Sequence, residues 1–101
     1  MKTSTITVAT EIINQLGGNH FIAMTGSYNF VYDSNSLLMH LRRNKAGATW
    51  MKITLTSMDT YTVEFIKQVK FENKTVKRIE GVYNDMLRSL FTEVTGLYTS
   101  L

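Results

Sequence analysis

Two histidines, His20 and His40, and eight carboxylates are the residues of this 101-residue chain best suited to chemistry, because it contains no cysteine. A zinc site needs three or four nitrogen, sulfur or carboxylate ligands. Neither histidine has a second histidine or a carboxylate at close strand or helix spacing. We therefore predict no metal site and no cofactor.

Nucleophilic catalysis is a second possibility, since His40 follows Ser36 and Asp33 and the three residue types match a catalytic triad. Residues in one turn and the strand that leaves it seldom converge on a single point. A hydrolase would need a pocket that holds His40 beside a carboxylate. The carboxylates are otherwise scattered without an acid and base pair, so we expect a protein that is not an enzyme.

Basic residues form two clusters, one around 42–52 without acidic residues and one around 67–78 that encloses only Glu72. If strands at 37–42, 49–56 and 60–71 form an up-and-down meander, the loop at 43–48 and the turn near Asn73 lie at one sheet end. We expect that end to bind a phosphate backbone. The predicted nucleic-acid site comprises Arg42, Arg43, Lys45, Lys70, Lys74, Lys77 and Arg78, with Trp50 as a stacking face to which Tyr28 or Tyr32 could add.

The alternative for the same residues is a solvated rim that keeps a small protein soluble. Lysines on an edge strand also deter pairing with other chains. The net charge of +3 and the pI near 9.3 favour an anionic partner only weakly. Binding of short DNA and RNA at low salt separates the two interpretations.

Length and composition indicate one compact domain, 1–101, with 44% hydrophobic and 19% charged residues. The absence of cysteine excludes disulfides and thiol catalysis. No apolar run reaches the length of a membrane span, and the first residues lack a secretory signal. We expect a cytoplasmic protein without a membrane partner.

Two amphipathic segments should position these residues, a helix at 4–16 that ends at Gly17-Gly18 and a helix at 82–95 that ends at Gly96. The second has an apolar stripe made of Tyr83, Met86, Leu87, Leu90, Phe91 and Val94. Gly17-Gly18 is interpreted as a helix stop rather than a phosphate loop, because it follows a helix and precedes an expected strand.

Strands are predicted at 20–25, 28–32, 37–42, 49–56, 60–71 and 75–79, with a bulge where Ile66 and Lys67 break the alternation and a turn at 72–74. Segment 20–25 is apolar on both faces, which is typical of a central strand. The expected fold is α+β, an antiparallel four- or five-stranded sheet with the N-terminal and C-terminal helices packed on one face.

The stretches at 15–19, 21–26, 51–55, 81–83 and 95–101 together resemble small uncharacterised proteins of bacteriophages and other mobile elements. The resemblance implies a compact non-enzymatic binder in the host cytoplasm, and it carries over no functional residue. We expect contact with nucleic acid or a nucleoprotein through the basic sheet end. The alternative is an inhibitor of a host defence or replication factor, with an exposed patch that includes Trp50, Tyr98 and Leu101.

Overall fold

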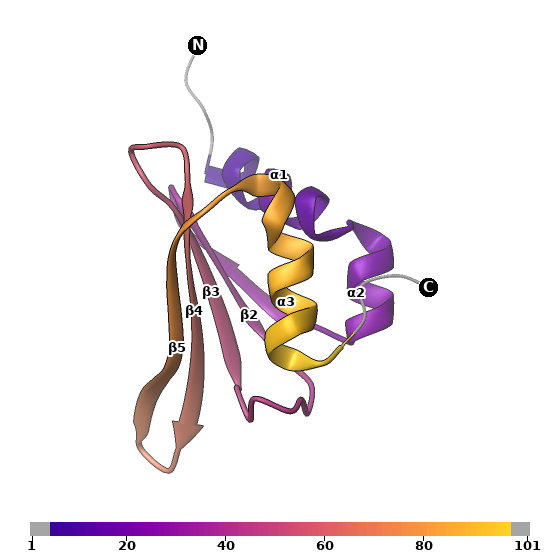
Figure 1. The fold of residues 1–101 in the computed structure, drawn as a ribbon, viewed down its shortest axis with the longest axis vertical. Helices are drawn as coiled ribbons and strands as arrows, with labels where there is room; N and C mark the ends of the chain where they lie inside the picture. Colours follow the sequence, from indigo (N-terminus) through magenta and orange to yellow (C-terminus); the bar gives the residue numbers. More distant parts are fainter. Residues whose placement is uncertain (1–4, 98–101) are drawn as a thin grey trace.

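The computed structural model describes residues 5–97, which form an α+β fold with one five-stranded antiparallel sheet and three α-helices (Figure 1). The strands lie in the sheet in chain order, so the sheet is an up-and-down meander. The predicted fold class and the antiparallel sheet are confirmed. The strands are β1 (Tyr28–Tyr32), β2 (Ser36–His40), β3 (Trp50–Leu55), β4 (Tyr61–Val69) and β5 (Glu72–Val82).

The alternation of side chains along β2, β3 and β4 separates a buried face from a half-exposed face. Leu37, Ile53 and Val63 lie opposite one another in neighbouring strands, and each is at most 1% exposed. Their sequence neighbours Leu38 and Lys52 point to the other face and are half-buried. We call this second surface the outer face.

The core joins the buried face to side chains of the helices, which stand together beside the sheet in Figure 1. The helices are α1 (Thr5–Leu16), α2 (Asn19–Thr25) and α3 (Leu87–Thr95). Their fully buried contributions include Ile12 and Leu16 of α1, Phe21 of α2 and Phe91 of α3. Among the residues described, no helix combines the length and apolar character needed to cross a bilayer.

Gly17 ends α1 as predicted, since the N–H groups of Gly17 and Gly18 both donate to the Ile13 carbonyl, at 3.1 and 2.8 Å. Both glycines have positive φ, which costs glycine little. They link two helices rather than a helix and a strand. A phosphate loop follows a strand, whereas these glycines follow the helix α1. The helix-stop interpretation is therefore kept, although the segment after the glycines is a helix and not the expected strand.

The strand predicted at 20–25 is wrong, because this segment is the helix α2. Phe21 and Thr25, four residues apart, are buried on one side, and the Thr25 hydroxyl donates to the Phe21 carbonyl at 2.7 Å. Phe21 packs edge to face on Phe91 with ring centroids 4.9 Å apart. Met24, one of the apolar residues of the predicted strand, is 39% exposed. A short apolar run fits either structure, and tertiary packing decides between them.

The helix predicted at 82–95 is shorter than expected, because Val82 belongs to β5 and a 3-10 turn, η1 (Asn84–Met86), precedes α3. Tyr83 and Met86, placed in its apolar stripe, are 60% and 47% exposed. The other residues of the stripe, Leu87, Leu90, Phe91 and Val94, pack in or against the core. Gly96 ends the helix in the left-handed conformation, as predicted, and its N–H donates to the Thr92 carbonyl.

The hairpin of β4 and β5 differs from its prediction in both turn and length. The turn lies at Lys70 and Phe71 instead of 72–74, and β5 runs over 72–82 instead of 75–79. The predicted bulge is present, since the pairing register shifts between Phe65 and Ile66.

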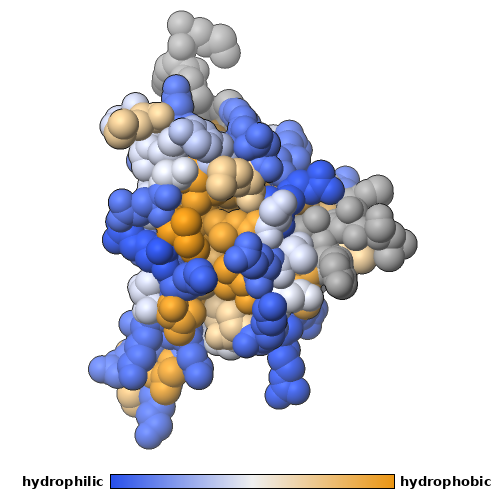
Figure 2. Space-filling view, viewed as in Figure 1, coloured by the Kyte–Doolittle hydropathy of each residue, from blue (hydrophilic) through white to orange (hydrophobic). Residues whose placement is uncertain are grey.

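Figure 2 shows apolar residues gathered in the centre of the molecule between β5 and α3, whereas the hairpin end is mostly hydrophilic.

Candidate nucleic-acid interface

The hairpin of β4 and β5 extends beyond the rest of the sheet. The pairing of β3 with β4 begins at Trp50 opposite Ile66, so residues after Ile66 have no third strand beside them. Every residue of 67–78 is exposed. We call residues 67–78 the arm. Its tip projects from the lower end of the sheet in Figure 1, and at its base Lys77 and Arg78 lie opposite Phe65 and Glu64 of β4.

The arm concentrates positive charge. Its basic residues are Lys67, Lys70, Lys74, Lys77 and Arg78, against the single carboxylate Glu72. Lys67 and Lys74 lie directly opposite each other in the ladder, and like charges in that arrangement destabilise a strand pair. Arg78 forms an exposed ion pair with Glu80 at 3.3 Å. The arm therefore carries a repulsion that an anionic ligand would relieve.

The loop between β2 and β3 lies at the same sheet end as the arm tip (Figure 1), as the predicted meander required. The Gln68 N–H donates to the Thr49 hydroxyl at 3.1 Å, which connects the arm to the end of this loop. The predicted site residues Arg42, Arg43 and Lys45 are exposed in this loop. The two basic groups, separate in sequence, are thus brought to one end.

Two of these loop cations also serve the fold. Arg42 donates from Nε to the Gly26 carbonyl at 3.1 Å, at the C-terminal end of α2. The side chain of Lys45 lies against Gly96, the C-cap of α3, and the backbone N–H of Lys45 donates to the Thr95 carbonyl at 3.1 Å. Cations are favourable at helix C-termini. The arm is therefore the part of the basic end without such a structural role.

A row of rings crosses the outer face beside the base of the arm. The rings of Tyr28 and His40 lie 4.5 Å apart, and those of His40 and Trp50 lie 4.7 Å apart at 73°. Arg42 covers Tyr28 at 4.9 Å, and Trp50 donates from Nε1 to Gln68 Oε1 at 3.4 Å. Trp50 is half-buried, so only part of the predicted stacking residue faces solvent.

The triad residues do not assemble. The Ser36 hydroxyl donates to Asp33 Oδ1 at 2.7 Å, and this bond, followed by the Asn35 N–H, lowers the Asp33 pKa below its usual 3.8. His40 lies four residues further along β2, about 13 Å away at strand spacing, between the rings of Tyr28 and Trp50. The Asp33 and Ser36 pair thus stabilises a turn, and His40 belongs to the ring row.

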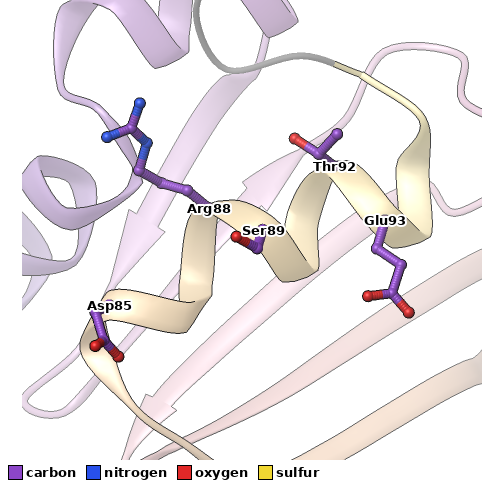
Figure 3. Close-up of a pocket in the computed structure, with 5 residues that line it drawn as sticks. All are labelled: Asp85, Arg88, Ser89, Thr92 and Glu93. Carbon is purple, nitrogen blue, oxygen red and sulfur yellow. The ribbon is translucent and has the colours of Figure 1, made fainter.

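The hollow beside α3 does not gather reactive groups either. Its volume is about 560 Å³, and its described lining residues are Asp85, Arg88, Ser89, Thr92 and Glu93, all from one stretch of chain. In Figure 3 the Arg88 and Glu93 side chains point away from each other. Across residues 5–97, no three histidines or carboxylates gather closely enough to hold a metal ion.

The predicted site left out four arm residues that bear on the interface, Lys67, Gln68, Phe71 and Asn73. Phe71 at the turn is fully exposed, at 103%. The predicted strand at 60–71 ended at this residue, and that position could have indicated an aromatic ring at the tip of the hairpin. Gln68 and Asn73 lie opposite each other across the arm. Both residues matter for the interface because they lie near Trp50, and residue order alone does not show that proximity.

Neither similarity to known proteins nor the predicted protein-binding patch adds a residue to the candidate interface. Comparison with protein-family models, curated proteins and solved structures gives no match. Tyr98 and Leu101, predicted for a protein-binding patch, lie outside the described residues.

Proposed function

We propose that this chain is a non-enzymatic nucleic-acid-binding protein that contacts the phosphate backbone through the arm and the adjacent loop at 42–48. The observation that carries the proposal is the arm, an exposed two-stranded ribbon with five cations and one carboxylate. A two-stranded ribbon is narrow enough to follow a nucleic-acid groove.

The charge distribution favours a ligand over a solvated rim. A rim that only preserves solubility has no need to place Lys67 opposite Lys74, since mixed charges serve solubility without the repulsion. Phe71 at the tip adds a fully exposed aromatic ring next to Lys70, and aromatic rings beside cations suit bases beside phosphates. The resemblance to small phage proteins fits a binder of this kind.

We also infer that the helices all cover the buried face of the sheet, which leaves the outer face open. The support is the alternation of burial in β2, β3 and β4, together with the position of the helices in Figure 1. Nucleic acid held by the arm would then have an uncovered sheet surface beside it.

Charge reversal tests the proposal. Glutamate at Lys67, Lys70, Lys74 and Lys77 should abolish binding of short DNA and RNA at low salt, because each reversal replaces attraction to phosphate by repulsion. For the unaltered protein, the slope of log affinity against log salt should be roughly −3 to −5 when about five phosphates are contacted. Fluorescence anisotropy at several salt concentrations measures both quantities.

Arginine at the same four positions is the matched control, since arginine retains the charge and binds phosphate. This variant should bind as tightly as the unaltered protein. Unaltered affinity of the glutamate variant, with its circular dichroism spectrum preserved, would contradict the proposal.

A protein-binding role is the second candidate, favoured by the edge strand β1. Val31 and Tyr32 on this edge are 56% and 47% exposed, and an unpaired strand edge can accept a partner strand. Val31→Asp should then abolish co-purification of a host protein from nuclease-treated lysate, whereas reversal of the arm charges should not. Loss of every partner after nuclease treatment would remove this candidate.

A further inference from the structure

A hollow opens on the outer face where the arm leaves the sheet. It is lined by Leu38, Trp50, Ile66, Gln68 and Asn73, and its volume is about 290 Å³. Ligand sites in proteins start near this size, so the hollow suits one small flat group rather than a long segment. The register accounts for it, because Trp50 lies opposite Ile66 and Gln68 lies opposite Asn73.

The chemistry of the lining is that of a nucleobase site. Leu38 and Ile66 provide aliphatic contacts, and Trp50 provides an aromatic one. The Trp50 indole donates to Gln68 Oε1, which leaves the Gln68 amide NH₂ as a donor toward a ligand. Asn73 adds a second carboxamide. Carboxamides form paired hydrogen bonds with base edges, and unpaired bases lie on aromatic rings in single-strand recognition.

Charge around the hollow is suited to the phosphates that flank a base. Lys52 lies two residues from Trp50 on the same outer face, with Glu64 opposite it in the ladder. Lys67 and Lys74 are the ladder neighbours of Gln68 and Asn73, and the alternation of side chains turns them to the other face of the arm. No carboxylate is among the described lining residues. A base within a nucleic-acid chain brings phosphates that can reach the cations on either face of this two-stranded arm, whereas a neutral aromatic ligand makes no use of them.

We propose that this hollow holds one unpaired nucleobase, so that the ligand of the arm is single-stranded nucleic acid. The inference rests on the proposed function and specifies its substrate class. A paired base cannot enter, because its hydrogen-bonding edge is occupied and its faces are stacked, and unstacking it costs a few kcal/mol per step. Duplex is then held by the arm through phosphates alone.

Trp50 is the only tryptophan of the chain, so its fluorescence reports on the hollow directly. A single-stranded oligonucleotide should quench Trp50 emission on binding, whereas a duplex of the same sequence should bind, as anisotropy shows, without quenching. The double variant Gln68→Ala, Asn73→Ala should lower single-strand affinity by roughly tenfold and leave duplex affinity unchanged. Both residues are exposed, so the variant should fold.

Ser57→Ala is the control, since Ser57 is exposed in the turn between β3 and β4 at the opposite sheet end, and it should change neither affinity. Equal quenching by duplex, unchanged emission despite single-strand binding, or an unaltered affinity of the double variant would overturn the base site. Each of those results leaves the proposed function standing. Failure of both nucleic acids to bind at low salt would instead overturn the proposed function and the base site with it.

Discussion

At the residue scale, Tyr61 shows how the core changes an ionisable group. Tyr61 begins β4 and is only 4% exposed. Burial first, and then the charges of Glu11 and Asp59, raise its pKa above the usual 10.0. The folded protein therefore retains the phenolic proton at pH values where the unfolded chain begins to lose it.

This difference predicts a loss of stability in alkali. Because the folded pKa is the higher one, the contribution of Tyr61 is fully present below about pH 10 and declines as pH rises through the folded pKa. Tyr61→Phe removes the titration, so its free energy of unfolding should fall less steeply above pH 10 than that of the unaltered protein. Urea unfolding between pH 8 and pH 11 measures the two slopes.

Tyr83→Phe, which removes an exposed hydroxyl, controls for the substitution itself and should follow the unaltered protein. Parallel pH profiles for Tyr61→Phe and the unaltered protein would show that Tyr61 does not contribute to the alkaline loss.

At the element scale, the arm combines weak local stability with clustered positive charge. It lacks a third strand after Ile66, and it pairs Lys67 with Lys74. Exposed hydrogen bonds with few buried neighbours open easily. The same cations that weaken the ribbon are those that would hold phosphate, so stability and binding should respond in opposite directions to a charge change.

Lys67→Glu makes this opposition measurable. An opposite-charge pair across the ladder contributes roughly 0.2–1 kcal/mol, so amide hydrogen exchange in the arm should slow while nucleic-acid affinity falls. Lys67→Gln, which only removes the charge, should be intermediate in both measurements. Exchange that is as fast in Lys67→Glu as in the unaltered protein would show that the lysine pair does not control opening of the arm.

At the scale of the whole molecule, the net charge of +3 is unevenly placed. The arm and the loop at 42–48 gather cations at one sheet end, and self-repulsion within such a group disfavours the folded state. At 0.1 M salt the Debye length is about 10 Å, so interactions between exposed charges farther apart than this are largely screened. The same screening weakens attraction to phosphate.

Rising salt should therefore raise the stability of the protein while it lowers affinity for nucleic acid. Thermal unfolding between 20 and 500 mM sodium chloride, together with anisotropy over the same range, compares the two trends. The variant with glutamate at Lys67, Lys70, Lys74 and Lys77 lacks the cation cluster and should gain less stability from salt. An equal gain in both proteins would place the repulsion elsewhere in the chain.

Local pattern was sufficient for the elements in which one face meets the core. The strands predicted at 37–42 and 49–56 are both present, and they pair as the predicted meander required. Glycines at 17 and 96 predicted two helix ends, because positive φ is inexpensive only for glycine. These features depend on neighbours in sequence, so a single chain is enough to read them.

Tertiary structure decided what depends on distant neighbours. Segment 19–25 is helical because Phe21 meets Phe91, a contact between residues seventy positions apart. The order of residues was enough to show that the basic residues cluster and that catalytic groups are sparse. The folded chain was needed to show that Arg42 and Lys45 support helix ends, that the tip of the β4 and β5 hairpin projects past β3, and that Gln68 and Asn73 lie beside Trp50. Strand register and side-chain packing set those distances.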